Sequence, residues 1–119
     1  MQRMIAGSEN RDAAPSQMRR GALEYCVLAL LRKDERYALE LIQELARSDG
    51  MVTSEGTIYP LLSRLRRERL VDTTWRESPS GPPRRYYRLT AAGQRALDRF
   101  AEQWRAFANA VDHILEAER

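Results

Sequence analysis

The sequence predicts a mainly α-helical fold with one small β-hairpin. Three observations lead to this prediction. Apolar residues recur with the 3.6-residue period of an α-helix in four separate stretches of the chain. That period is lost between residues 70 and 89, where two runs rich in β-branched or aromatic residues flank a cluster of Pro, Gly and Ser. A chain of 119 residues, 43% hydrophobic and 31% charged, also has the size and composition of one globular domain.

The N-terminal part of the chain contains the first two predicted helices. Residues 1–17 carry few apolar side chains, so we expect an N-terminal arm that contains at most a short helix. Two helices follow, each with one apolar face, and the all-charged stretch 32–36 separates them. The apolar faces consist of Leu23, Val27, Leu30 and Leu31 in the first helix and of Ala38, Leu41, Ile42 and Leu45 in the second.

The third predicted helix begins near Thr53 or Ser54, because either hydroxyl can accept a hydrogen bond from an unpaired N–H group at a helix N-terminus. Its inner face consists of Ile58, Leu61, Leu62 and Leu65. Pro60 lacks the N–H group that a helix interior needs, so we expect either a kink or a start later than Ser54. The helix is expected to end near Arg69.

A β-hairpin is predicted to follow the third helix. Residues 70–76 and 84–89 are the two strands, and the turn-forming residues 78–83 connect them. Adjacent residues of a strand point to opposite faces, so Tyr86 and Tyr87 cannot both be buried. Tyr87 shares its face with the last apolar residue of the strand and is therefore the predicted core residue.

Thr90 is the predicted N-cap of a long final helix, whose apolar residues are spaced alternately three and four positions apart. This heptad seam consists of Leu97, Phe100, Trp104, Phe107, Val111 and Ile114. The seam either packs on its own domain or pairs with a second copy of the chain. Three aromatic residues on the terminal helix of so small a protein favour self-association. We therefore predict that the six seam residues form a homodimer interface.

The sequence excludes several classes of protein. It contains one cysteine and one histidine, which rules out a disulfide within the chain and a Cys/His zinc site from one chain. The same scarcity removes most routes to acid–base catalysis, so we expect no metal, no cofactor and no enzymatic activity. No apolar run reaches 18 residues and no signal peptide opens the chain, so we expect a cytoplasmic protein with no membrane partner.

The positive charge of the chain is concentrated in its middle. Ten of the 20 basic residues are arginines between positions 64 and 99, where only four acidic residues occur. Such a block is typical of a surface that binds a polyanion. However, 19 of the 20 basic residues are arginines, which is also what a general preference for arginine codons produces. The charge alone leaves both interpretations open.

The predicted order of elements is that of a winged helix-turn-helix, in which the third helix enters the DNA major groove. Two groups of residues are the candidate DNA contacts. The third helix offers short polar groups at its tip and cations further along, namely Ser54, Thr57, Tyr59, Arg64 and Arg67. The hairpin would form the wing and offers Arg84, Arg85 and Tyr86 to the DNA backbone or the minor groove.

Two segments of this sequence closely resemble the PadR family of bacterial transcriptional regulators. They are TIYPLLSRLRRERLVDTTW, residues 57–75, and PPRRYYRLTAAG, residues 82–93. The resemblance extends from about Gly21 to the C-terminus. The family usually has Tyr-Gly-Tyr at the start of its second helix, whereas this chain has Tyr37-Ala38-Leu39. Any contact of that motif with the DNA backbone therefore falls to Tyr37 alone.

The resemblance implies a domain organisation and a mode of action. Residues 18–90 would be the winged helix-turn-helix DNA-binding domain, and residues 91–119 the single dimerisation helix of the short subfamily. Members of the family are mostly repressors that leave DNA when a small effector binds. The homodimer would bind a roughly palindromic site in double-stranded DNA, with its two recognition helices about 34–36 Å apart.

The resemblance also suggests a place for the effector. Trp104 from each chain would sandwich a planar aromatic molecule, and Phe100 and Phe107 would extend that slot. The alternative for Trp104 is that it only packs in the dimer interface. For the protein as a whole, the alternative is a winged-helix module that binds another protein and no nucleic acid. The acidic first half of the chain would suit such a partner, whereas the arginines of the hairpin favour DNA.

Overall fold

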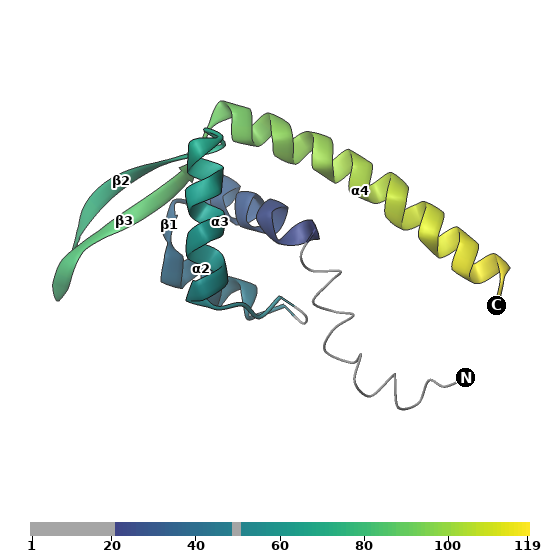
Figure 1. Cartoon of the computed structure of the whole chain (residues 1–119), viewed down its shortest axis with the longest axis horizontal. Helices are drawn as coiled ribbons and strands as arrows, with labels where there is room; N and C mark the ends of the chain where they lie inside the picture. Colours follow the sequence, from purple (N-terminus) through teal and green to yellow (C-terminus); the bar gives the residue numbers. More distant parts are fainter. Residues whose placement is uncertain (1–20, 49–50) are drawn as a thin grey trace.

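The computed structural model describes residues 21–48 and 51–119, which form four helical segments and one three-stranded antiparallel sheet (Figure 1). The arm predicted for residues 1–17 lies outside the described residues. The described chain begins within a helical segment, residues 21–33. Figure 1 shows the helices gathered at the base of a projecting hairpin, while the last helix extends away on the other side. The prediction of a mainly α-helical winged fold is confirmed.

A two-residue strand that the sequence did not predict lies at the end of the charged stretch 32–36. Strand β1, Arg36–Tyr37, pairs antiparallel with β3, Gly81–Leu89. The strand order of the sheet is β1-β3-β2, where β2 is Val71–Ser78. Helix α2, Ala38–Leu45, starts directly after it, and the N–H group of Tyr37 donates to Oε1 of Glu40 at 3.2 Å. The stretch is charged and short, and its pairing partner lies some fifty residues away, so no local pattern marks it as a strand.

Helix α3, Glu55–Arg67, has Ser54 at its N-cap position as predicted, but the Ser54 side chain forms no capping hydrogen bond. The N–H group of Ile58 donates to the Ser54 carbonyl oxygen at 2.9 Å. Of the two outcomes expected from Pro60, a kink or a later start, the later start is wrong, because the helix already begins at Glu55 and contains the exposed Pro60. Just after the C-terminal end of the helix, Arg69 adopts a left-handed conformation with a φ of 62°. This conformation is common at that position and stops the helix.

Strands β2, Val71–Ser78, and β3, Gly81–Leu89, form the wing. Both strands reach closer to the tip than predicted, because Ser78 pairs with Gly81 and only two residues remain in the turn. Pro82 and Pro83 lie inside β3, where the prediction placed a turn. They are tolerated there because β1 pairs only with residues 86 and 87, so this part of β3 has β2 as its single neighbour.

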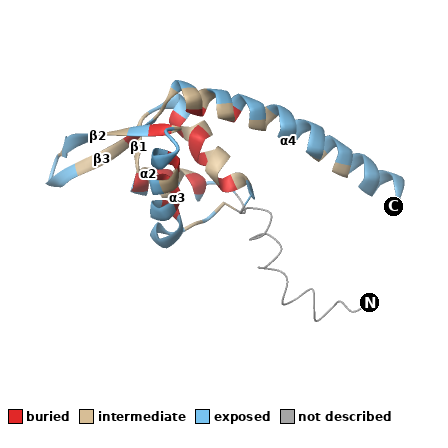
Figure 2. Ribbon diagram, turned by 45° about the horizontal axis from the view of Figure 1, so that its top comes forward, coloured by how far each residue is buried: buried red, intermediate tan, exposed pale blue. Residues whose placement is uncertain are grey.

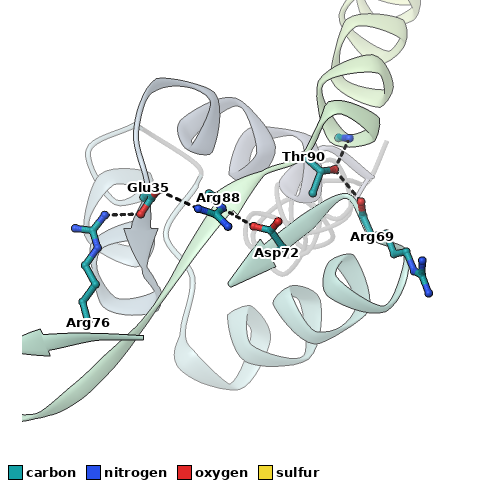
Figure 3. Close-up of polar contacts among 7 residues, drawn as sticks. Glu35, Arg69, Asp72, Arg76, Arg88 and Thr90 are labelled. Carbon is teal, nitrogen blue, oxygen red and sulfur yellow. Dashed lines mark hydrogen bonds and ion pairs between the residues drawn. The ribbon is translucent and has the colours of Figure 1, made fainter. Parts of the chain in front are cut away.

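Helix α4, Ala91–Ala117, is anchored to the domain at its first turn. The Thr90 hydroxyl accepts a hydrogen bond from the N–H group of Gly93 at 3.0 Å and donates to the carbonyl oxygen of Arg69 at 2.8 Å (Figure 3). Gly93 packs so closely that an added Cβ would lie 2.1 Å from the carbonyl oxygen of Leu70. The direction in which α4 leaves the domain is thus set by backbone contacts at the end of α3.

The hydrophobic core lies where the helices meet the base of the wing, as the buried residues in Figure 2 show. Its fully buried side chains are Val27, Leu28, Leu41, Ile58, Leu62, Leu65 and Val71. Tyr87 is 6% exposed, which confirms it as the core member of the tyrosine pair. The distal part of α4 is exposed in Figure 2. None of the helices that the structure describes combines the length and apolar character needed to span a lipid bilayer.

Candidate nucleic-acid interface

Helix α3 has one face in the core and one face toward solvent. Its inner side chains are buried, whereas Ser54, Thr57 and Tyr59 are exposed, and Tyr59 keeps 49% of its surface accessible. These are the short polar and aromatic groups predicted at the tip of a recognition helix. All three are accessible at the N-terminal end of α3, but Thr57 and Tyr59 lie on different sides of the helix because they are two residues apart.

The two candidate arginines on α3 differ in their environment. Arg67 is exposed, as a residue that meets a phosphate needs to be. Arg64 instead turns back to the helical segment 21–33, where its Nη2 donates to Oε1 of Glu24 at 2.8 Å. This hydrogen bond raises the pKa of the Arg64 guanidinium. The ion pair with Glu24 compensates the charge of Arg64 within the chain and fastens α3 to that segment, so Arg67 is the less compensated of the two arginines, while a DNA contact of Arg64 stays a prediction.

One face of the wing carries a ladder of aromatic rings and cations. The ring of Tyr37 on β1 meets the ring of Tyr86 on β3 edge-on, with centroids 5.3 Å apart. The guanidinium of Arg76 lies 4.2 Å from the Tyr86 centroid, and that of Arg84 lies 4.5 Å from the Tyr37 centroid. Cations over ring faces are held by the ring quadrupole, so both predicted tyrosines position the arginines of the wing.

The other face of the wing carries Trp75, Arg85 and Tyr87. Arg85 is the cross-strand partner of Trp75, and its guanidinium lies 4.9 Å from the centroid of the indole. Burial raises the pKa of the Tyr87 hydroxyl. Because strand residues alternate, Arg84 and Arg85 lie on opposite faces of the hairpin, although the sequence places them side by side. The wing therefore presents Arg84 on one face and Arg85 on the other.

A chain of ion pairs fixes the base of the wing to the helical part (Figure 3). Glu35, which precedes β1, pairs with Arg76 on β2, and its second oxygen lies 3.9 Å from Arg88. Arg88 in turn donates to Oδ1 of Asp72 at 2.7 Å, and this bond raises the pKa of its guanidinium. The charges of Arg76 and Arg88 are thus compensated within the protein. These two residues therefore attract an external anion less than the charge count suggests.

A cavity of about 510 Å³ opens between α3 and the wing. It is lined by Tyr37, Ala38, Tyr59, Ser63, Trp75, Pro83, Arg84, Arg85 and Tyr87. Two residues of α3, Tyr59 and Ser63, thus border the same space as both wing arginines. Among the residues that the structure describes, no group of three or more His, Cys, Asp and Glu side chains is placed to hold a metal ion.

The heptad seam of α4 divides into two parts. Leu97 is 4% exposed and packs in the core of its own domain, so its predicted place in the dimer interface is wrong. Phe100 stacks on Tyr25 of the segment 21–33, with centroids 4.0 Å apart and rings parallel within 1°. Further along the helix, the ring centroid of Trp104 lies 6.0 Å from that of Phe100 and 6.4 Å from that of Phe107.

The rest of the seam is accessible. The exposed fractions of Trp104, Phe107 and Ile114 are 49%, 63% and 60%, and Val111 is half-buried. These residues therefore form a continuous apolar stripe that the described part of the protein leaves uncovered.

Trp75, Ser63 and Tyr25 also belong to these surfaces, although the sequence did not predict them. By the alternation of β2, Trp75 would be expected in the core beside Val71, but 60% of its surface is exposed, and it lines the cavity between α3 and the wing. An aromatic residue close to the tip of a long hairpin is the signal that could have found it. Tyr25 has no comparable local signal, because its stacking partner lies 75 residues away.

Comparison with known proteins places the chain among regulators of one family. The model of the transcriptional regulator PadR-like family matches residues 27–99. The structure of a PadR family transcriptional regulator from Eggerthella lenta is 33% identical with a TM-score of 0.84, covering 94% of this chain and 97% of that one.

Two further regulators are similar. A PadR-like transcriptional regulator from Bacillus cereus is 37% identical with a TM-score of 0.76, covering 83% of this chain and 96% of that one. A PadR-like transcription factor from Bacteroides fragilis is 43% identical with a TM-score of 0.71, covering 86% and 98%.

Proposed function

The chain belongs to the PadR-like family of transcriptional regulators, and from this premise we propose that it is a homodimeric repressor that binds a roughly palindromic operator. The family membership confirms that the protein is a regulator of transcription and not an enzyme. The repressor would act in the bacterial cytoplasm on the DNA of the nucleoid. It would leave its operator when a planar small molecule binds between the C-terminal helices.

One observation carries the proposed DNA contact. Tyr59 of α3 and the two arginines of the wing border the same cavity, so a duplex lying against this part of α3 reaches the wing. In this arrangement Ser54, Thr57 and Tyr59 would meet base edges in the major groove. Arg67 on α3, and Tyr37, Arg84, Arg85 and Tyr86 at the wing, would hold phosphates and sugars.

The proposed dimer rests on the accessible part of the seam. Trp104, Phe107, Val111 and Ile114 form an apolar stripe on a helix that extends away from its own domain (Figure 1). Pairing two such helices would bury both stripes and fix the separation of the two recognition helices. The winged domains would then match two half-sites about one duplex turn apart, roughly 34–36 Å.

The proposed release has a contact route in the structure. An aromatic effector between the two Trp104 side chains would displace Phe100, which stacks on Tyr25. The residue next to Tyr25 is Glu24, whose Oε1 accepts a hydrogen bond of 2.8 Å from Nη2 of Arg64 on α3. A shift of α4 would therefore reach α3 through two neighbouring residues of one helical segment, and this would change the separation on which operator binding depends.

The DNA contact is tested by charge reversal at the wing. The double variant Arg84→Glu and Arg85→Glu should weaken binding to the protein's own upstream DNA by at least about tenfold and reduce the dependence of affinity on salt, because phosphate contacts release counterions. The measurement is a gel-shift titration at several salt concentrations. The matched control is the double variant Arg95→Glu and Arg99→Glu, which changes the net charge of the protein by the same amount but on α4. Equal losses in both double variants would show that net charge matters and the wing does not.

The dimer is tested by placing charges on the seam. Wild-type protein at micromolar concentration should scatter light as a particle of twice 13.8 kDa. The double variant Phe107→Asp and Val111→Asp should run as a monomer, because it puts carboxylates into an apolar interface. The control Gln103→Asp with Asn109→Asp adds the same charge beside the seam and should stay dimeric. A monomeric wild-type protein would contradict the proposal.

A further inference from the structure

One arginine of the wing is turned to a carboxylate of the protein, although it lies between two of the proposed DNA contacts. Arg76 on β2 is the cross-strand partner of Arg84, and its guanidinium lies 4.2 Å from the ring centroid of Tyr86. Both of these neighbours are proposed to meet the DNA backbone, so an arginine between them would be expected to add a phosphate contact. Figure 3 shows instead that the Arg76 side chain extends to Glu35.

The sheet determines the position of Glu35. This residue directly precedes β1, in which Arg36 is the partner of Tyr87. Continuing the antiparallel register by one residue places Glu35 opposite Arg88, on the face of the sheet that the buried Tyr87 does not share. Arg76 and Arg88 both reach the Glu35 carboxylate from this face, and Nη1 of Arg88 lies 3.9 Å from its Oε2. The Glu35 side chain is 28% exposed, whereas each arginine side chain is 50% exposed.

The two arginines differ in what would hold them if Glu35 carried no charge. Arg88 would still donate to Oδ1 of Asp72 at 2.7 Å. Arg76 has no second carboxylate among the ion pairs of the described residues, so its charge would become uncompensated. Because half of its side chain is accessible, a phosphate can approach its guanidinium from solvent. Glu35 is therefore the single group in the described part of the chain that compensates the charge of Arg76.

We infer that Glu35 competes with DNA phosphates for Arg76 and thereby lowers the affinity of the protein for any duplex. A guanidinium forms charge-assisted hydrogen bonds of the same kind with a carboxylate and with a phosphate, so the two anions compete for its N–H groups. Phosphate contacts carry no sequence information, so the competition should lower the affinity for every duplex by the same factor. Glu35 is thus a positioning residue that acts on DNA through Arg76. The inference rests on the proposed function, because it requires that this face of the wing meets DNA.

The variant Glu35→Gln tests the competition in the full-length protein. Glutamine keeps the size of the side chain and removes its charge, and exposed ion pairs contribute little to stability, so the fold should persist. Binding is titrated against the protein's own upstream DNA and against a random duplex of equal length, at several salt concentrations. The variant should bind both duplexes about fivefold more tightly. Its plot of log affinity against log salt should be steeper by about 0.9, because one more phosphate is neutralised.

Three further variants separate the competition from a general effect of charge. Arg76→Gln alone should change the affinity by less than about twofold, because Glu35 already holds that guanidinium. In the double variant Glu35→Gln and Arg76→Gln, the gain in affinity and the steeper salt dependence should both disappear. Glu77→Gln removes the same charge from the position next to Arg76 and should leave the salt dependence unchanged, because no ion pair of the described residues includes Glu77. A gain that persists without Arg76, or an unchanged salt dependence in Glu35→Gln, would overturn the inference.

The same titrations distinguish failure of this inference from failure of the proposed function. If the wild type prefers its upstream DNA and Glu35→Gln binds like the wild type, the regulator function stands and the competition is overturned. If the wild type does not distinguish the two duplexes but the variant shows a gain that depends on Arg76, the competition stands and the sequence-specific function fails. If no variant binds either duplex, both fail. A gain confined to one duplex would contradict a competition for phosphates.

Discussion

The two ends of helix α4 have the same heptad pattern but opposite surroundings. Near its start, Gly93 and Leu97 are buried in the core, and a side chain larger than hydrogen at position 93 would collide with the backbone of Leu70. Past the middle, Phe107 and Ile114 expose 63% and 60% of their surface. The heptad spacing thus identifies the apolar face of a helix but does not say which partner covers each part of it.

The difference separates folding from assembly. The proximal end belongs to a core that also holds α2, α3 and the base of the wing, so it stabilises a single chain. The distal end adds nothing to that core and presents apolar surface to water, which is unfavourable until another surface covers it. Mutations at the two ends should therefore change different quantities, namely the free energy of unfolding and the dimerisation constant.

The largest expected effect comes from a truncation in the core. Leu62→Ala should lower the free energy of unfolding by about 3 kcal/mol, because Leu62 is fully buried and its loss leaves a cavity. Ile114→Ala should change the stability of the monomer by less than about 0.5 kcal/mol, because most of Ile114 is already exposed. Urea unfolding over a range of protein concentrations separates the two. A concentration-independent loss in Ile114→Ala as large as that in Leu62→Ala would show that the distal end packs on its own domain.

A smaller effect is expected from the glycine that anchors α4. Gly93→Ala should destabilise the protein by about 2 kcal/mol, because the new methyl group meets a carbonyl oxygen that cannot move without disrupting the end of α3. Gly56→Ala is the matched change in α3, where the nearest atom is Ser54 Oγ at 3.7 Å. There alanine should be neutral or stabilise by up to about 0.5 kcal/mol, because it restricts the unfolded chain. Thermal unfolding of both variants measures the contrast, and equal stabilities would remove the steric argument for the anchor.

Most of the fold was predictable from local signals. The apolar faces of the helices follow from the spacing of apolar residues. Ser54 and Thr90, at the N-cap positions, mark the starts of α3 and α4. The features that the sequence did not predict depend on contacts between distant parts of the chain. Strand β1 exists only because β3 pairs with it, and the strands of the wing extend past the predicted turn because the prolines lie where β3 has a single neighbour.

The candidate site was predictable in composition but not in arrangement. The exposed positions of Ser54, Thr57 and Tyr59 follow from the period of α3. The period does not reveal that Arg64 meets Glu24, because that contact joins two helices forty residues apart. Charge counts likewise treat all arginines alike, whereas ion pairs within the chain compensate some of them and leave those of the wing tip available to an anion.

The smallest expected effect concerns Tyr87, at the edge between the buried core and the accessible wing. Burial raises the pKa of its hydroxyl, so the native state holds this proton to a higher pH than the unfolded chain does. The stability that this provides is complete below the ordinary tyrosine pKa of about 10, and it is lost as the pH rises through the native pKa. Urea unfolding of the wild type should therefore show a decline in stability with increasing alkalinity that Tyr87→Phe lacks. Tyr86→Phe removes a phenol from the opposite face of the same strand and should retain the decline. If the Tyr87→Phe protein lost stability as steeply as the wild type, the hydroxyl would not belong to the buried region.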